Sequence, residues 1–368
     1  MTDDALVSTQ RPRRLSLDRL PNPAETLSAL ADYADGSVSD TYMSGELFDR
    51  LQVQIAGLLG KEAALYLPSG KLAQMAALKV LTGRARCSRV AMHPRAHLEE
   101  YEARAYQELW GLTSTQLGGY DRLPTCDDLI AIHEALGAVT LELPMRRIGC
   151  LLPSWKQLTE LTGLARERDL FLHMDGARLW ESQPFYDRPL HEITELFDTV
   201  YVAFDKGLGA LGGAALAGPQ WVIDEASIWQ RRAGGRTLRS FPYVLSALKA
   251  LDERLPRMAE FHEKAVALAK TLSCIPGIRV SPNPPHANAF LVSMIGDSGR
   301  ATEVRDRIAG ELNIWLFDDP VDSVEQSTVR FEVTVRGAAF EFNLDEVRQA
   351  VQHFSDLVGS GKIPASVP

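Results

Sequence analysis

The sequence predicts an α/β fold, with a large domain built on a mostly parallel sheet and a smaller α+β domain after it. Up to about residue 205, short apolar runs typical of interior strands alternate with longer amphipathic runs, and this order gives a parallel or mixed sheet. After about residue 245, a long helical pattern leads into shorter alternating segments. We therefore expect an N-terminal arm over residues 1–35, a large domain over 36–245 and a small C-terminal domain over 246–368.

The elements of the large domain follow in chain order. Apolar residues three or four positions apart in GELFDRLQVQIAGLLGKE predict an amphipathic helix that ends at Gly60. The stretch AALYLPSGKLAQMAALKVL then predicts a strand, a tight turn and a helix. Further strands are expected at residues 138–143, 170–174 and 199–204, with a helix in PSWKQLTELTGLARERD between the first two.

The small domain is expected to begin with one long helix in SALKALDERLPRMAEFHEKAVALAKTL. Strands are predicted in IRVSP, AFLVSMI and VRFEVTV, and a final helix from Leu344 to Val358. This change of pattern favours an appended α+β unit over a continuation of the first sheet.

Composition and charge argue against several classes of partner. The formal net charge is -9, so no global basic field exists to hold nucleic acid or an anionic membrane. No apolar run approaches the roughly 20 residues of a spanning helix, and no apolar segment of an export signal follows the arginine cluster RPRRLSLDRL. We therefore expect a cytoplasmic protein that binds neither nucleic acid nor a membrane.

The cysteines and histidines do not predict a metal site. The four cysteines are widely separated and form no CxxC pair, which speaks against zinc and against a disulfide framework. The stretch HPRAHLEE holds two histidines four positions apart, but it lacks a glutamate beside the first and contains Pro94. We expect a reducing compartment and no bound metal.

Three turns that follow predicted strands carry the side chains for chemistry, because ligands of open α/β sheets bind beyond the carboxyl ends of the strands. PSGK places Ser69 and Gly70 at a helix N-terminus, where N–H groups and a hydroxyl bind an anion. Asp175 directly follows the apolar strand LFLHM, and Lys206 follows another apolar strand and precedes a glycine-rich segment.

Together these turns predict a site for pyridoxal 5′-phosphate. That cofactor needs a lysine amine for its aldehyde, a carboxylate for its pyridine N–H and an anion cradle for its phosphate. Glycines after Lys206 let the backbone approach the cofactor closely. Each signal alone is weak, because an aspartate after a strand is often a turn former. The order of the three turns, with one helical crossover between Asp175 and Lys206, favours the cofactor site.

Four stretches resemble the threonine aldolase and β-eliminating lyase family of fold-type I pyridoxal phosphate enzymes. GKEAALYLPSGKLAQMAAL is similar to that family's GKEAALFVPSGTxxN segment, and HMDGARLW to its HxDGARL segment. DKGLGA resembles its SKGLGAP segment, and RRAGGRTLRS its RKxxGGGMRQ segment. The resemblance runs from about residue 40 to about residue 335 and implies the transferase-like fold-type I architecture.

The resemblance implies a role for each matching residue on the cofactor side. Lys206 is the implied Schiff-base lysine, and Asp175 is the implied partner of the pyridine nitrogen. Ser69 and Gly70 are implied phosphate ligands, with Lys71 beside them.

Further roles concern the substrate and a second subunit. His97 in PRAHLEEYE, where the family has SHIxxYE, would lie over the ring face and move protons, unless it is an ordinary surface histidine. Arg178 would bind the substrate carboxylate as a planar fork, unless it forms a strand-end salt bridge. Arg330 in VRFEVT is a looser match to a second carboxylate ligand, and Arg239 would reach a cofactor phosphate of a neighbouring subunit.

Several positions depart from the family pattern. Lys71 replaces the threonine of SGT, where it adds a cation beside the phosphate or a second acid group of the substrate, or is simply exposed. Asp205 replaces the serine before the lysine, and Leu17 stands where the RSDT motif has a serine. ELPMRR replaces ENTHN, with Pro144 or Met145 where a histidine near the substrate hydroxyl is expected. The missing groups concern substrate more than cofactor.

The function implied is cleavage of a β-hydroxy-α-amino acid to glycine and an aldehyde, the reaction of a pyridoxal phosphate-dependent aldehyde-lyase. The alternative is β-elimination or another Cα transformation, which the missing ENTHN histidine favours. From another class, a non-catalytic binding protein on the same fold stays open, whereas PSGKLAQ lacks the features of a Walker loop. The family implies a homodimer or homotetramer with active sites at the subunit interface and a small-molecule amino-acid substrate.

Overall fold

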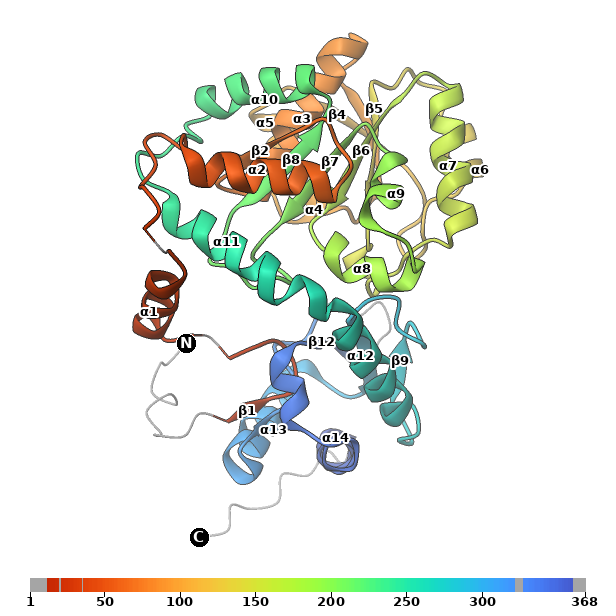
Figure 1. Ribbon diagram of the computed structural model, residues 1–368. Coiled ribbons are helices and arrows are strands. Elements are labelled where there is room, and N and C mark those ends of the chain that lie inside the picture. The colour runs from red at the N-terminus through yellow and green to blue at the C-terminus, as the bar shows by residue number, and fades with distance from the viewer. Residues whose placement is uncertain (1–11, 20, 35, 322–326, 360–368) are drawn as a thin grey trace. The chain divides into compact units, whose positions relative to one another are not determined.

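The computed structural model in Figure 1 describes residues 12–19, 21–34, 36–321 and 327–359. They form two compact units: one spans Asn22–Met258, and the other combines the preceding residues with those from Ala259 onward. The division predicted from the sequence, an arm over residues 1–35, a large domain over 36–245 and a small domain over 246–368, stays a prediction. Across the described ranges, no helix is both long and apolar enough to span a membrane.

The larger unit is built on a mostly parallel sheet. Its strands are β2 (Ala63–Leu67), β3 (Arg89–Met92), β4 (Thr113–Gln116), β5 (Ala138–Glu142), β6 (Phe171–Gly176), β7 (Thr199–Ala203) and β8 (Ala214–Gly218). They lie in the order β2-β8-β7-β6-β5-β3-β4. Among these strands β8 alone runs against its neighbours, so the others end at one edge of the sheet. The predicted α/β class is therefore confirmed.

Helices cover both faces of this sheet. The described helices are α1 (Pro23–Ala34), α2 (Glu46–Leu58), α3 (Gly70–Ala85), α4 (His97–Glu100), α5 (Ala105–Glu108), α6 (Cys126–Ile130), η2 (Arg146–Ile148), α7 (Trp155–Glu167), α8 (Leu179–Tyr186), α9 (Leu190–Glu195), α10 (Gln220–Arg232), α11 (Phe241–Glu253) and η3 (Leu255–Arg257). On β2, Leu65 and Leu67 pack with α3 and α10. Tyr66 points to the other face and meets Phe48 of α2 edge-on, with ring centroids 5.2 Å apart. Burial on both faces is what a parallel sheet requires.

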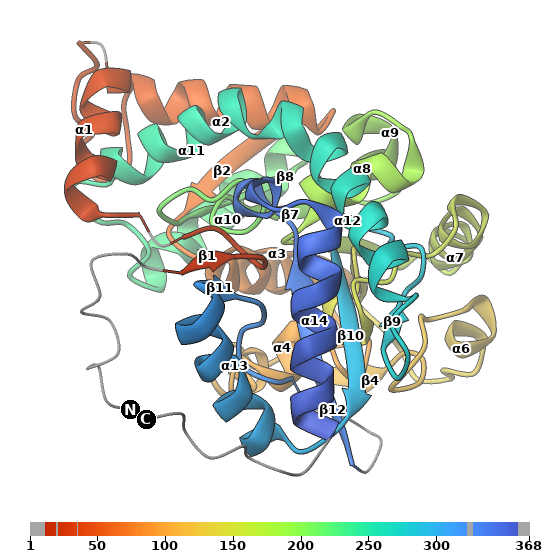
Figure 2. The ribbon, with the colours of Figure 1, turned by 90° about the horizontal axis from the view of Figure 1, so that it is seen from below.

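The smaller unit has its own antiparallel sheet and core. Its elements are α12 (Met258–Leu272), β9 (Arg279–Ser281), β10 (Ala289–Ile295), α13 (Ser298–Leu312), β12 (Thr328–Thr334), η4 (Gly337–Glu341) and α14 (Leu344–Gly359), with the strand order β12-β10-β9. Figure 2 shows α14 lying along β10 and β12. Phe354 of α14 packs with Phe317 and Phe331, and the three ring centroids are 4.6 to 5.7 Å apart.

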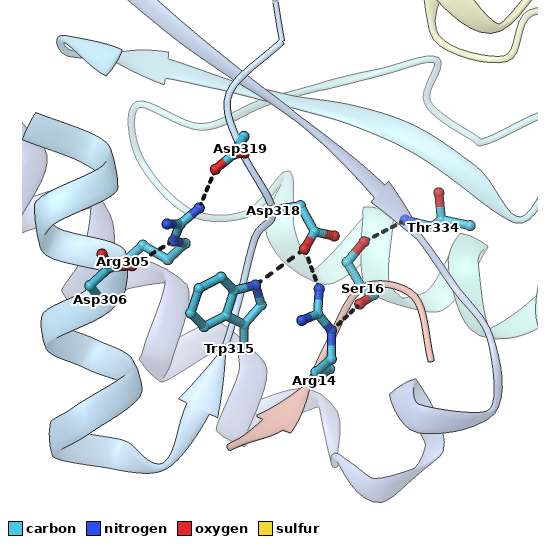
Figure 3. Close-up of polar contacts among 8 residues, drawn as sticks. All are labelled: Arg14, Ser16, Arg305, Asp306, Trp315, Asp318, Asp319 and Thr334. Carbon is cyan, nitrogen blue, oxygen red and sulfur yellow. Dashed lines mark hydrogen bonds and ion pairs between the residues drawn. The ribbon is translucent and has the colours of Figure 1, made fainter. Parts of the chain in front are cut away.

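The N-terminal segment is part of this smaller core. β1 (Arg13–Arg14) pairs in parallel with β11 (Ile314–Trp315). Figure 3 shows Arg14 paired with Asp318, which also accepts a hydrogen bond from Trp315 Nε1 at 3.2 Å. The Thr334 N–H donates to Ser16 Oγ at 3.1 Å. These contacts hold the segment before Asn22 against strands from the far end of the chain.

Three features differ from the sequence expectations. The described part of the predicted arm contains β1 and α1, and the Tyr33 hydroxyl of α1 donates to Asp252 of α11 at 2.6 Å. The single long helix expected after residue 245 is divided into α11, η3 and α12, because Pro256 lacks an N–H and cannot continue a regular helix. The sequence pattern also misses β3 and β4, which have four residues each, and β8, whose sequence AALAG consists of small residues apart from one leucine.

Candidate active site

An open cleft of about 330 Å³ lies where β2, β5, β6 and β7 end in the larger unit. It is lined by most of the predicted site residues, namely Ser69, Gly70, Lys71, His97, Asp175, Arg178 and Lys206. Further charged or aromatic residues at its surface are Glu102, Glu142, Arg146, Tyr201 and Asp205. The parallel strands therefore bring together groups that are far apart in the sequence.

Backbone atoms form the wall of the cleft next to Ser69. Ser69 caps α3, and its side-chain oxygen accepts a hydrogen bond from the Leu72 N–H at 3.3 Å. A Cβ on Gly70 would lie 1.9 Å from the Tyr201 hydroxyl, so a side chain at this position would clash. The start of α3 offers N–H groups, and the Ser69 hydroxyl retains a proton to donate. This wall therefore fits a phosphate.

Asp175 is a buried carboxylate whose surroundings suit a cationic partner. Its side chain belongs to a residue that is only 5% exposed, and it accepts a hydrogen bond from the Ala177 N–H at 3.1 Å. Burial raises the pKa of Asp175, while the Ala177 hydrogen bond and His97 act in the opposite direction. A pyridine N–H placed against this carboxylate would offset the cost of burying its charge. Asp175 thus fits the role predicted for it.

Glu142 is a half-buried carboxylate, opposite Asp175 on the neighbouring strand β5. Its two oxygens accept hydrogen bonds from the backbone N–H groups of His97 and Arg146, both at 3.2 Å. Burial, and then the charge of Asp175, raises the pKa of Glu142 to about 7. Glu142 is therefore readily protonated near neutral pH, and it fixes the backbone at two positions that line the cleft.

His97 begins α4 and is bound to an acidic side chain. Its Nδ1 lies 3.0 Å from Oε1 of Glu102, whose side chain is buried. This hydrogen bond raises the pKa of His97, the charges of Asp175 and Glu142 add to the effect, and partial burial opposes it. The imidazole also stacks on Tyr101, with ring centroids 5.3 Å apart. Because Glu102 holds Nδ1, Nε2 is the nitrogen that can exchange a proton with a ligand.

Lys206 follows β7 on a turn where glycines allow close packing. A Cβ on Gly207 would lie 2.3 Å from the Glu181 carboxylate, and a Cβ on Gly213, where φ is +93°, would lie 2.4 Å from a tyrosine hydroxyl. The Lys206 Nζ is 3.0 Å from Oδ2 of Asp205, and the lysine side chain is 37% exposed. Its amine is therefore accessible from the cleft, next to the acid that replaces the family's serine.

Arg178 and Lys71 add positive charge to the same cleft. Arg178 precedes α8 and is half-buried, whereas Lys71 is the second residue of α3 and is exposed. A guanidinium suits a carboxylate and an ammonium suits a phosphate. Their predicted roles are compatible with these places but stay predictions.

Two predicted residues do not line the cleft as described. Arg239 donates to the Asp40 carbonyl at 2.6 Å and to Thr41 Oγ1 at 3.0 Å, within its own chain. Arg330 lies on β12, in the other compact unit. Their assignments to a neighbouring subunit's phosphate and to the substrate carboxylate therefore stay predictions.

The sequence interpretation missed Glu102, Glu142 and Arg146. A signal for Glu142 was present, because it ends an apolar strand as Asp175 does. In the ELPMRR stretch, Met145 is 2% exposed, and it is Arg146 that reaches the cleft surface.

Within the described ranges, no group of three or more His, Cys, Asp and Glu side chains is arranged to hold a metal ion.

Comparison with known proteins gives a family for this arrangement. The model of the family described as "Beta-eliminating lyase" matches residues 24–295. Low-specificity L-threonine aldolase 1 of Arabidopsis thaliana is 30% identical over 265 residues, which cover 69% of this chain and 73% of that relative.

Solved structures extend the likeness to the whole fold. A Listeria monocytogenes protein, provisionally described as an L-allo-threonine aldolase, has a TM-score of 0.89 and 34% identity, covering 94% of this chain and 97% of that one. An Exiguobacterium protein, provisionally described as an aromatic amino acid β-eliminating lyase/threonine aldolase, has a TM-score of 0.89 and 32% identity, covering 95% and 98%. The fold predicted from the four motifs is therefore confirmed.

Proposed function

This chain belongs to the β-eliminating lyase family, and on that premise we propose that it is a pyridoxal phosphate-dependent lyase of the threonine aldolase type. The proposed reaction breaks the Cα–Cβ bond of a β-hydroxy-α-amino acid and releases glycine and an aldehyde. Relatives named as threonine aldolases support this proposal. They favour an enzyme over the non-catalytic binding protein considered from the sequence.

The cofactor side of the cleft has a residue for each part of the cofactor. When bound, pyridoxal phosphate supplies an electron sink for the electron pair of the broken bond. Lys206 provides the amine that joins it covalently, Asp175 faces its pyridine nitrogen, and Ser69 and Gly70 bind its phosphate. The carboxylate of Asp175 is buried, and burial raises its pKa, so a cationic partner would stabilise its charged form. This supports an orientation of the cofactor with its pyridine nitrogen toward Asp175.

The substrate side supplies carboxylate binding and proton transfer. Arg178 holds the α-carboxylate with two parallel hydrogen bonds and so orients the bond that is to break. His97 accepts the β-hydroxyl proton at Nε2 while Glu102 stabilises the charged imidazole. Cα gains a proton when glycine is released, so the reaction needs no other reactant.

A single observation carries the proposal. The helix start after β2, the end of β6 and the turn after β7 bring Ser69 and Gly70, a buried carboxylate and an accessible lysine into one cleft. An absorption spectrum of the pure protein with added pyridoxal phosphate, followed by assays of glycine and aldehyde release from a panel of β-hydroxy amino acids, tests it. A spectrum without a protein-bound cofactor, or no glycine from any member of the panel, would reject the proposal.

A second reaction, β-elimination, is favoured by one observation. Pro144 or Met145 stands where the ENTHN histidine is expected, and both are buried, so the imidazole expected near the substrate hydroxyl is missing. β-Elimination would release ammonia and a keto acid instead of glycine and an aldehyde. The same assays, with ammonia measured in parallel, separate the two reactions.

The assembly and its compartment belong to the same proposal. We expect a homodimer or homotetramer in the cytoplasm, with Arg239 of one subunit reaching the phosphate site of another. Within its own chain, the Arg239 guanidinium donates to the carbonyl of the buried Asp40. The Asp40 carboxylate in turn accepts hydrogen bonds from the Ser240 and Phe241 N–H groups, both at 2.9 Å. Arg330 is proposed as a second ligand of the substrate carboxylate. Sedimentation analysis and the cofactor affinity of Arg239→Ala test these expectations.

A further inference from the structure

Arg146 is a cleft residue that the proposed reaction does not use. It lies four residues beyond Glu142, at the start of η2, and lines the cleft near the end of β5. Leu143 and Met145 before it are each 2% exposed and turn into the protein. The segment therefore brings an arginine to the cleft lining, near the position where the family pattern leads us to expect an imidazole.

The backbone of Arg146 is held firmly in place. Its N–H donates to Oε1 of Glu142 at 3.2 Å. Met145, directly before it, exchanges two backbone hydrogen bonds with Leu151, at 2.8 and 3.2 Å. A side chain that leaves such an anchored turn samples few positions, which is a property of groups that select a ligand.

Each cationic residue of the cleft can be compared with the anionic or reactive group that it would bind. In the proposed reaction Lys206 binds the cofactor aldehyde and Arg178 binds the α-carboxylate, while His97 is paired with Glu102. Lys71 lies at the start of α3, beside the proposed phosphate position. Among the cationic residues of the cleft lining, Arg146 is thus the one to which the proposed reaction assigns no group of the cofactor or of the α-amino acid.

On the basis of the proposed function, we infer that the substrate is a β-hydroxy-α-amino acid whose β-substituent carries a carboxylate, and that Arg146 binds this second carboxylate. A guanidinium offers two parallel N–H groups in the plane of a carboxylate, which an imidazole or an ammonium cannot do. The nearby Glu142 supports the choice, since burial beside Asp175 raises the pKa of Glu142 and reduces the negative charge that a substrate carboxylate would meet. With β-hydroxyaspartate, the reaction would yield glycine and glyoxylate.

The first test compares substrates. β-Hydroxyaspartate carries the second carboxylate, and β-phenylserine and threonine are neutral. We expect the holoenzyme to prefer β-hydroxyaspartate in kcat/KM. Arg146→Gln should reduce kcat/KM for it by about 10- to 100-fold, the range for losing a charge-assisted hydrogen bond, with a much smaller change for the neutral substrates. Arg146→Lys should restore part of the preference.

Arg147 provides a matched control, because it has the same charge one residue further on. Its Nε donates to the Glu100 carboxylate at 2.7 Å, and its guanidinium lies over the Tyr101 ring, 5.0 Å from the centroid. Arg147→Gln should leave the ratio of acidic to neutral kcat/KM unchanged, even if both values fall. Equal preference in the wild type, or a ratio that Arg146→Gln does not alter, would overturn the inference.

A binding experiment separates this inference from the proposed reaction. Succinate carries two carboxylates and propionate carries one, and neither can be cleaved. Calorimetry with the holoenzyme should show tighter binding of succinate in the wild type and loss of that difference in Arg146→Gln. If no β-hydroxy amino acid is cleaved but this difference is present, the proposed function fails and the second carboxylate site stands. Equal binding of the two acids would reject the site.

Discussion

The two sides of the cleft differ in how their chemistry is built. The cofactor wall, residues 69–71, 175 and 206–213, consists of the start of α3, the end of β6 and the turn after β7, and the backbone of Gly70, Gly207 and Gly213 lies directly against other groups. The β5 turn, residues 142–146, carries the buried side chains of Leu143 and Met145 between Glu142 and Arg146, which are both half-buried and line the cleft. The first wall follows the family motifs closely, and the second departs from them.

This difference shows which part of an active site can vary within one fold. A Cβ on Gly70 would lie 1.9 Å from the Tyr201 hydroxyl, so the cofactor wall tolerates little change. In the β5 turn the Glu142 carboxylate accepts a hydrogen bond from the backbone N–H of Arg146, a contact that any residue except proline could make at position 146. We therefore expect backbone geometry to determine cofactor binding and single side chains to determine substrate preference.

The largest effect is expected at Lys206. Lys206→Ala should remove the covalent link to the cofactor and lower kcat by about 10³-fold or more, as for other nucleophile removals. Borohydride reduction followed by peptide mapping checks this. Lys71→Ala is the control and should keep the reduced adduct on Lys206. An adduct found on Lys71 in the wild type would reverse the assignment of the two lysines.

Asp175→Asn should cost about 3 kcal/mol of transition-state stabilisation, more than a hundredfold in rate, because an amide cannot stabilise a ring cation. The same substitution should not lower the stability of the apo protein at pH 7. Burial raises the pKa of Asp175 above its unfolded value, so the ionised form weakens the apo fold above that unfolded pKa, and the weakening fades as pH falls through the folded pKa. Apo Asp175→Asn should thus melt no lower than wild type at pH 7. Unchanged turnover with bound cofactor would contradict the catalytic role.

Glu102→Gln should have an intermediate effect, because Glu102 acts through His97. The Glu102 hydrogen bond is the main cause of the raised pKa of His97. Its loss should move the limb of the pH–kcat/KM profile that reports His97 to lower pH and reduce kcat by about tenfold. The stability from this pair is present below the unfolded pKa of His97 and is lost as pH rises through the folded pKa, and the variant should lack that dependence. A pH profile identical to wild type would show that His97 does not transfer the proton.

The sequence revealed the cofactor wall because its signals are local. Asp175 and Lys206 each follow an apolar strand, and Ser69 lies between a strand and a helix, so pattern and order were sufficient. The His97–Glu102 contact could have been suspected from the YE of PRAHLEEYE, but a short polar segment does not by itself predict the hydrogen bond. Nothing local distinguishes Arg146 from Arg147; they differ because Arg147 pairs with Glu100 at the end of α4, whereas Arg146 lines the cleft.

The same reasoning explains the errors in the fold. A helical periodicity continues through Pro256, so the pattern predicted one helix where the backbone forms three pieces. β8 has the sequence AALAG, whose small residues carry little strand signal, and it is fixed by pairing with β2 and β7 on either side. Elements determined by distant neighbours are the ones that local patterns miss.

The smallest effect is expected at Lys71. A substitution there tests whether this residue acts on the cofactor side or on the substrate side of the cleft. Lys71 is exposed at the start of α3, and an exposed cation contributes at most about 1 kcal/mol, so Lys71→Thr should weaken cofactor retention by no more than about fivefold. The loss should shrink at high salt, because exposed charges are screened. Lys79→Thr is a matched control on the same helix, since Lys79 donates to the Trp110 carbonyl at 2.8 Å and is not part of the cleft lining. If Lys71→Thr instead changes the ratio of acidic to neutral substrates while cofactor retention stays the same, then Lys71 belongs with Arg146 on the substrate side, and the boundary between the two walls runs through the first turn of α3.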